Sequence, residues 1–167
     1  IIYMFCNEGI EIKHPNTVTN NYIIGHVDCG TPWGRILDKN KYVHIAPFGD
    51  MHGTVFRHNI FYHRGKQTAF YDLYNGFLRL DVEKEPELTD CDIDSNLYYS
   101  TADESYSQSY LQSLQARGLS QHGIAADPMF EDIDGGNFRL APNSPALKLG
   151  IKQIDIQKTG LLKENYK

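Results

Sequence analysis

Residues 123–150 read GIAADPMFEDIDGGNFRLAPNSPALKLG, and this stretch carries the clearest fold signal in the chain. Asp127–Phe130 is a short apolar run that contains a proline, whose missing N–H suits the start or the edge of a strand. Gly135-Gly136 supplies a turn, and Asn137–Leu140 alternates polar and apolar residues as a half-buried strand does. The stretch, called the closing segment below, therefore predicts a short hairpin followed by turns that closes an end of the fold.

A helix is predicted for residues 103–117, directly before the closing segment. Thr101–Glu104 forms a capping box, in which Thr101 is the N-cap and Glu104 reaches back to it. Arg117-Gly118 supplies a cation and a glycine at the other end. Apolar residues recur near helical spacing between these ends, at Tyr106, Tyr110, Leu111 and Leu114. We expect this apolar stripe to pack against the rest of the fold.

Three earlier segments repeat one another: Val18–Ile24, Phe56–Tyr62 and Ile93–Tyr99. Each has an asparagine in its middle, and these residues, Asn21, Asn59 and Asn96, lie 38 and 37 residues apart. A fixed period of this kind indicates a solenoid of stacked units, here built of short strands. Asparagine suits a recurring bend because it tolerates unusual φ and its amide can bond to the backbone and to the next asparagine. The repeats therefore predict a ladder of stacked asparagine side chains.

The order of these elements resembles the C-terminal part of right-handed parallel β-helix proteins, the pectin-lyase-like superfamily. The matching features are the helix, Ala126–Phe130, Gly135–Leu140 and Ser144–Ala146. The resemblance implies an all-β fold, with β-helix coils and long loops in residues 1–100 and the helix and closing segment in residues 101–167 of the same domain. Members of this superfamily include polysaccharide lyases, glycoside hydrolases, esterases, epimerases and non-catalytic adhesins, so the fold does not settle the function.

Composition narrows the possible partners of this 167-residue chain. Hydrophobic residues make up 41% and charged residues 22%, which is ordinary for a single globular domain. A formal charge of −5 without a Lys/Arg run argues against nucleic acid. No apolar run approaches the roughly 20 residues of a membrane-spanning helix. We expect no membrane partner.

The chain reads as the C-terminal part of a longer secreted, periplasmic or cell-surface protein, because it opens on a strand-like stretch, Ile1–Phe5. Upstream coils of that protein, or another copy, would then pack against its N-terminal end. Its three cysteines, Cys6, Cys29 and Cys91, form no disulfide framework. We expect buried free thiols, with Cys6 and Cys29 on adjacent coils.

A polar column is predicted on the outside of the coils. Its strands are expected at residues 9–13, 42–46 and 77–82, with residues 68–73 as the alternative for the third. The expected outward residues are Glu11, Lys13, His44, Arg79 and Asp81. Carboxylates on adjacent coils would be about 4.8 Å apart, near the roughly 5 Å of a retaining glycosidase, and two coils apart they would match the wider inverting separation.

Two loops add candidate residues beside this column. Gly49–Gly53 places Asp50 two residues before His52, which offers a carboxylate near an imidazole. The spacing matches no established zinc pattern, and we expect neither a metal nor another cofactor. Trp33 lies in a loop of proline and glycine, where its ring could stack on a sugar or cover the core.

The favoured interpretation is a glycoside hydrolase acting on a carbohydrate substrate through paired carboxylates in a groove on the β-helix side. Catalytic candidates are Glu11, Asp50, His52 and Asp81; substrate-binding candidates are Lys13, Trp33, His44, Arg57 and Arg79. A polysaccharide lyase acting on a uronate-containing glycan is the first alternative. Lys13, His44, Arg57 and Arg79 could supply the cation that neutralises the uronate carboxylate. A non-catalytic glycan-binding or adhesin module is the second.

Overall fold

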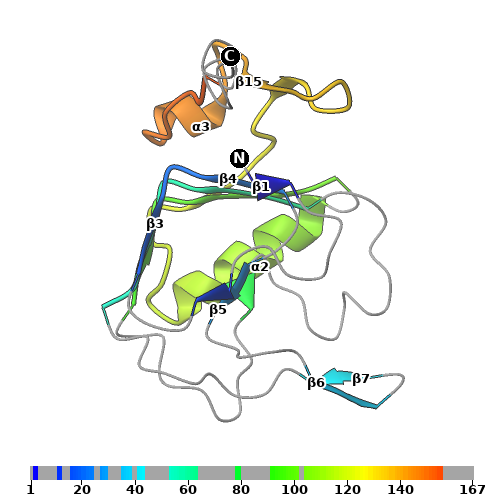
Figure 1. Cartoon of the computed structure of the whole chain (residues 1–167). Coiled ribbons are helices and arrows are strands. Elements are labelled where there is room, and N and C mark those ends of the chain that lie inside the picture. The colour runs from blue at the N-terminus through cyan, green and yellow to red at the C-terminus, as the bar shows by residue number, and fades with distance from the viewer. Residues whose placement is uncertain are drawn as a thin grey trace, which may run out of the picture.

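The computed structural model describes residues 16–24, 53–63, 91–101 and 104–155, together with short strands at residues 2–3, 11–12, 27–29, 35–38, 41–43 and 78–79. These residues form parallel sheets with some helices (Figure 1). In this part of the chain, no helix combines the length and the apolar character needed to cross a membrane.

The largest sheet has five strands, all parallel, in the order β1-β4-β9-β12-β13. Its strands are β1 (Ile2–Tyr3), β4 (Tyr22–Ile24), β9 (Ile60–His63), β12 (Leu97–Ser100) and β13 (Ile124–Ala125). Register pairs Tyr22 with Ile60 and Ile60 with Leu97, so equivalent residues of the three repeats lie side by side. The repeated segments of the sequence are therefore neighbouring strands of one sheet.

Two further parallel sheets have three strands each. One contains β3 (Thr17–Thr19), β8 (Val55–Arg57) and β11 (Asp92–Asp94), with β8 in the middle. The other contains β2 (Glu11–Ile12), β5 (Val27–Cys29) and β10 (Leu78–Arg79), with β5 in the middle. Three consecutive units of the chain, β2-β3-β4, β5-β8-β9 and β10-β11-β12, thus each give one strand to each of the three sheets.

The strands expected to carry the polar column are found in two of the three units. Glu11–Ile12 and Leu78–Arg79 lie in one sheet, as predicted. The expectation for residues 42–46 was wrong, because β7 (Lys41–Val43) pairs antiparallel with β6 (Arg35–Asp38) in a separate hairpin. Val27–Cys29 occupies the middle position instead.

The asparagine ladder is present. The Asn59 Oδ1 atom accepts hydrogen bonds from the backbone N–H of Asn21 at 3.0 Å and from its Nδ2 at 3.2 Å. Asn96 Oδ1 accepts the equivalent pair from Asn59 at 2.9 and 3.1 Å. The amide nitrogens also reach into the sheet, where Asn59 donates to the Val18 carbonyl and Asn96 to the Phe56 carbonyl. Asn59 and Asn96 are fully buried, so these bonds satisfy groups that water cannot reach.

The bend next to the ladder differs from the expectation. At each of these bends the residue one position before the ladder asparagine has a positive φ: Asn20, His58 and Ser95, each at 55°. A single left-handed residue turns the chain from one sheet into the next, after which the ladder asparagine can direct its amide inward. The ladder asparagines were expected to supply the unusual φ, and that part of the prediction was wrong.

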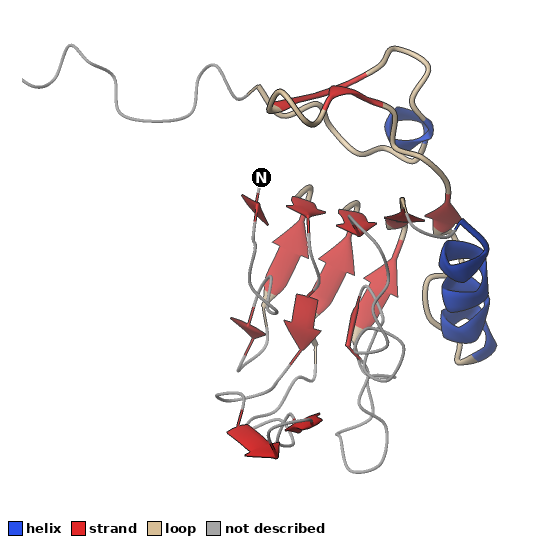
Figure 2. Ribbon diagram, turned by 90° about the vertical axis from the view of Figure 1, so that its right-hand side faces the viewer, coloured by secondary structure: helices blue, strands red, loops and turns tan. Residues whose placement is uncertain are grey.

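The interior between the sheets is apolar, and α2 (Glu104–Ala116) packs against it at one end. The two sheets that meet at the ladder, β3-β8-β11 and the five-stranded sheet, contribute Val18, Phe56, Ile93, Ile23, Phe61 and Tyr98 to one cluster of buried side chains. Leu111 and Leu114 of α2 join it, and α2 packs against β12 and β13. The helix lies beyond the last strands of the stack (Figure 2). The helix predicted for residues 103–117 is thus present, with its apolar stripe on the core.

One strand of the closing segment, β13, forms the last strand of the five-stranded sheet. The rest of the segment does not close the end of the stack, although the sequence predicted that it would. It contains an antiparallel hairpin of β14 (Phe130–Asp132) and β15 (Asn137–Leu140), followed by α3 (Pro145–Lys148). In Figure 1 these elements lie above the five-stranded sheet, whereas α2 lies below it. The ring of Phe130 is 5.4 Å from that of Tyr22 and 5.5 Å from that of Tyr62. The segment therefore covers the outer face of that sheet back to the first unit.

The composition of the five-stranded sheet explains this placement. Its strands are apolar at successive positions, and both faces are consequently buried. A second cluster of buried side chains joins its outer face to the closing segment: Tyr22, Ile24, Ile60, Tyr62, Leu97, Leu140, Ala146 and Ile151. Without the closing segment this face would be an exposed apolar surface. Among the cysteines, Cys91 is buried, the Cys29 strand is described, and Cys6 lies outside the described residues.

Replacing Tyr22 by Phe should weaken the attachment of residues 152–154, which follow the closing segment. The buried Tyr22 hydroxyl donates to the Lys152 carbonyl at 3.0 Å and accepts from the Ile154 N–H at 3.3 Å. Without this hydroxyl, the Lys152 carbonyl and the Ile154 N–H each lose a hydrogen bond. We therefore expect Tyr22→Phe to lower the free energy of unfolding by about 1–2 kcal/mol. Urea unfolding measures this loss, and amide exchange should quicken at Ile154. An unchanged exchange rate there would contradict the proposed role of the hydroxyl.

Candidate functional site

One row of residues across the three-stranded sheet β2-β5-β10 brings charged residues of distant segments together. Glu11 of β2 is in register with Asp28 of β5, and Asp28 is in register with Arg79 of β10. Residues in register on adjacent parallel strands are about 4.8 Å apart. These three positions, called the carboxylate–arginine row below, join residues from all three units of the fold.

The row contains two of the predicted site residues, Glu11 and Arg79, and one that sequence reasoning missed. The prediction assigned His44 to the middle position, but the strand there is β5, which carries Asp28. The missed signal was the alternation of Val27-Asp28-Cys29, apolar, polar and apolar, which begins two residues after Gly25. The remaining predicted site residues lie outside the described residues: Lys13, Trp33, His44, Asp50, His52 and Asp81.

Arg57, predicted to bind substrate, lies on the neighbouring sheet β3-β8-β11. Its Nε donates to the Asp92 Oδ2 atom at 2.6 Å, and the two side chains are 40% and 44% exposed. This hydrogen bond, together with the charges of Asp92 and Asp94, raises the pKa of the Arg57 guanidinium. An exposed pair of this kind contributes little to stability. It nevertheless fixes the guanidinium against one carboxylate on the outer face of the sheet.

An aspartate–histidine pair that the sequence did not indicate lies beside Arg57. Asp94 Oδ2 is 2.7 Å from His122 Nδ1, and Asp94 Oδ1 accepts from the backbone N–H groups of His122 and Ser95 at 2.8 and 2.7 Å. Burial opposes ionisation of this carboxyl, but the hydrogen bonds from His122 and Ser95 outweigh it and lower the pKa of Asp94. The Asp94 side chain is only 15% exposed, and the His122 side chain is 77% exposed.

Asp94 joins the third unit to the loop before the closing segment, and its effect on stability should depend on pH. Because its pKa is lower in the folded protein, its carboxylate stabilises the fold fully above the unfolded-state value, about 3.9. That stabilisation is lost as the pH falls through the folded-state value. We expect Asp94→Asn to lower the free energy of unfolding by about 1–2 kcal/mol at pH 7, and by progressively less below about pH 4. Urea unfolding across this range tests the sign; a pH-independent difference would contradict it.

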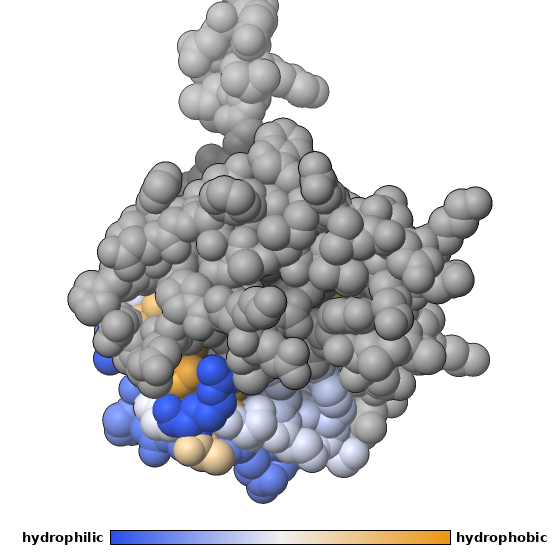
Figure 3. Space-filling model, turned by 90° about the horizontal axis from the view of Figure 1, so that it is seen from below, coloured by the Kyte–Doolittle hydropathy of each residue, from blue (hydrophilic) through white to orange (hydrophobic). Residues whose placement is uncertain are grey.

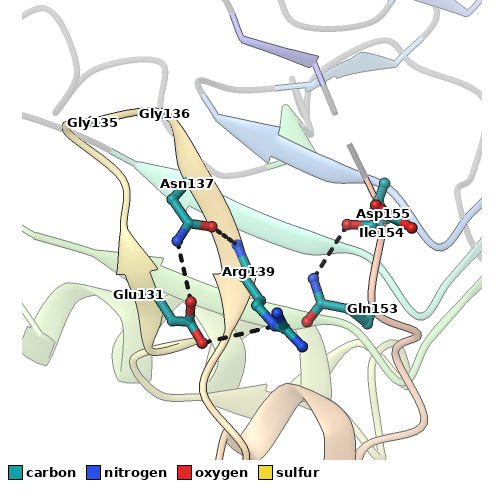
Figure 4. A pocket seen from close by; sticks show the side chains of 8 residues that line it. All are labelled: Glu131, Gly135, Gly136, Asn137, Arg139, Gln153, Ile154 and Asp155. Atoms are coloured by element: carbon teal, nitrogen blue, oxygen red, sulfur yellow. Dashed lines mark hydrogen bonds and ion pairs between the residues drawn. The ribbon is translucent and has the colours of Figure 1, made fainter. Parts of the chain in front are cut away.

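A polar pocket opens beside the β14–β15 hairpin, with a volume of about 480 Å³. Glu131, Asn137 and Arg139 line one side together with the turn Gly135-Gly136, and the extended residues Gln153–Asp155 line the other (Figure 4). Gly136 has a φ of 79°, which favours glycine in this turn. The hairpin pocket contains both donors and acceptors of hydrogen bonds, and sequence reasoning had treated this region as structural only.

The described residues offer little else that could define a site. They contain no group of three or more His, Cys, Asp or Glu residues placed to hold a metal ion. Viewed from below, the surface formed by described residues is mainly hydrophilic (Figure 3). Met129, at 37%, is the large hydrophobic residue exposed within this part of the chain. An apolar docking patch is therefore not a feature of the described surface.

Comparisons with known proteins do not identify a family or a function for this chain. No family model, no curated protein and no solved structure matches this chain.

Proposed function

We propose that the chain forms coils of a right-handed parallel β-helix, in the manner of the pectin-lyase-like proteins, and acts as a glycoside hydrolase. Support for the architecture comes from three units that each give one strand to each of three parallel sheets. The asparagine ladder at the corner between two of these sheets supports it further. The carbohydrate substrate would lie along the outside of the coils, and the location would be secreted, periplasmic or at the cell surface.

The observation that carries the enzymatic proposal is the register of Glu11 with Asp28. Retaining glycosidases use two carboxyl groups about 5 Å apart, one as nucleophile and one as general acid and base. Adjacent parallel strands supply about this separation through their own spacing of about 4.8 Å. We therefore propose Glu11 and Asp28 as the carboxyl pair, in place of a pair that includes Asp50 or Asp81.

Arg79 supports a second candidate function, a polysaccharide lyase. It is in register with Asp28 on the opposite side from Glu11. In a lyase, a cation neutralises the carboxylate of a uronate, while a base removes the neighbouring proton and the glycosidic oxygen leaves with the bonding electrons. The products separate the two reactions, because only elimination gives an unsaturated uronate that absorbs in the ultraviolet.

The test uses the isosteric variants Glu11→Gln and Asp28→Asn with a panel of neutral and uronate-containing oligosaccharides. Each variant retains the shape of the side chain, but its amide group carries no charge and cannot serve as the acid or base. We expect either change to lower kcat by at least about a hundredfold, the usual contribution of a positioned acid or base. Release of reducing ends and ultraviolet absorbance report hydrolysis and elimination separately.

Glu104→Gln is the matched control, because Glu104 is an exposed carboxylate on α2, outside the three parallel sheets. Its turnover should stay within about twofold of that of the parent. If both Glu11→Gln and Asp28→Asn keep parental turnover, the carboxyl pair is wrong. Binding of an oligosaccharide with no turnover by the parent would favour the non-catalytic glycan-binding module instead.

A further inference from the structure

We propose that the hairpin pocket is a carbohydrate-binding site for a single sugar unit, separate from the carboxylate–arginine row. The pocket lies between the hairpin of the closing segment, which covers the five-stranded sheet, and residues 153–155, which follow that segment. The row belongs to the sheet β2-β5-β10. A glycan could therefore be held at the pocket without passing through the proposed catalytic residues. The proposal goes beyond the hydrolase assignment, because it applies equally to a non-catalytic protein.

The polar groups on the hairpin side of the pocket are held in place by one another. Asn137 Nδ2 donates to Glu131 Oε2 at 3.1 Å, and Asn137 Oδ1 accepts from the Arg139 backbone N–H at 3.1 Å. Arg139 Nε lies 3.8 Å from Glu131 Oε1. An amide, a carboxylate and a guanidinium are thereby arranged side by side before a ligand arrives. Such preorganisation lowers the entropy lost on binding.

The opposite side of the pocket is also fixed. Gln153 Oε1 accepts from the backbone N–H of Leu140, and its Nε2 donates to the Ile154 carbonyl. The first bond ties Gln153 to the hairpin strand β15, and the second fixes its side chain against its own segment. The two walls therefore belong to one hydrogen-bonded unit, and Figure 4 shows their side chains on either side of the pocket.

The chemistry of these groups favours a polyhydroxylated ligand. Each sugar hydroxyl can donate and accept, and neighbouring hydroxyls match planar groups that present two atoms at once. Glu131 supplies acceptors, Arg139 supplies several donors, and Asn137 and Gln153 carry both. The volume of about 480 Å³ lies in the range of small-molecule sites. Glu131 also partly neutralises Arg139, which favours a neutral sugar over a simple anion.

The side chains that would touch the sugar are accessible. Arg139 is 69% exposed and Glu131 is 41% exposed. Both can be changed without disturbing the buried cluster beneath the hairpin, to which neither belongs. The variants Arg139→Gln and Glu131→Gln therefore test recognition with little risk to folding.

The experiment titrates the ¹⁵N-labelled parent with glucose, galactose, mannose and their β-linked disaccharides, and separately with sodium sulfate. Backbone amide shifts report where each probe binds. We expect at least one neutral sugar to shift amides of residues 131–139 and 153–155 with millimolar affinity. Arg139→Gln and Glu131→Gln should each weaken that binding about fivefold or more, as the loss of one hydrogen bond to a charged group would. Lys148→Gln, which changes an exposed cation on α3 outside the pocket, should leave it unchanged.

Three outcomes would overturn the proposal: no sugar shifts these amides, sulfate shifts them but sugars do not, or both pocket variants bind as the parent does. The result is distinct from that of the hydrolase test. Glu11→Gln should abolish turnover and leave the pocket shifts intact, whereas Arg139→Gln should weaken the pocket shifts and leave turnover of short substrates intact. Failure of one proposal would consequently leave the other standing.

Discussion

Asn59→Ala should be among the most destabilising single substitutions in this protein, with a loss of about 3–5 kcal/mol in the free energy of unfolding. Asn59 is the middle residue of the ladder and is fully buried. Its amide bonds to Asn21 on one side, to Asn96 on the other and to the Val18 carbonyl of the first unit. Alanine would leave several of these groups buried without a partner. Urea unfolding followed by circular dichroism measures the loss.

Asn21→Ala is the matched control for this substitution. Asn21 has the same role in the first unit, but it is only partly buried, and its side chain contacts one neighbour of the ladder, Asn59. When the Asn21 side chain is removed, the side-chain oxygen Oδ1 of Asn59 still accepts a hydrogen bond from the backbone N–H of residue 21. We expect a cost of about 1 kcal/mol. Equal losses at Asn59 and Asn21 would mean that the ladder contributes no more inside the stack than at its edge.

Phe61→Ala should also lower the free energy of unfolding by about 3–5 kcal/mol, through a cavity in the interior. Phe61 is fully buried, and its ring stacks on that of Tyr98 with centroids 5.3 Å apart and planes 7° apart. It belongs to the cluster that joins the two sheets on either side of the ladder to α2. Removing the ring therefore weakens three elements at once.

The graded variant Phe61→Leu separates cavity formation from loss of the ring. Leucine keeps most of the volume but none of the stacking, and we expect a loss of about 1–2 kcal/mol. Thermal or urea unfolding of both variants gives the comparison. Should leucine prove as costly as alanine, the stacked ring would matter more than the filled volume.

The repeats of the sequence predicted local structure well, because their signals act over a few residues. The asparagine spacing gave the ladder, and the alternation around Arg79 gave β10. The apolar stripe of residues 106–114 gave α2. For β10 and α2 the hydrophobic period is contained within one element, whereas the ladder was predicted from a spacing that recurs across three units. Tertiary packing then stabilised local structures that the sequence already favoured.

The candidate site was predicted in part. Glu11 and Arg79 were placed in one row by their strand patterns, and both are in register with the same residue of the strand between them. That residue is Asp28 and not His44, because the long connections between units allow either Val27–Cys29 or a later segment to fill the middle strand. Sequence alternation is similar for both, so only strand pairing separates them.

The closing segment shows most clearly what each level decides. By itself, the sequence determined that residues 127–140 form a hairpin and that turns follow, since proline, paired glycines and alternation act locally. Only the tertiary structure decided that this hairpin lies across the outer face of the five-stranded sheet and not at the end of the stack. The reason is burial: Tyr22, Ile60 and Leu97 present an apolar outer face that needs a cover, and residues far along the chain supply it. Such a match between distant surfaces has no local sequence signature.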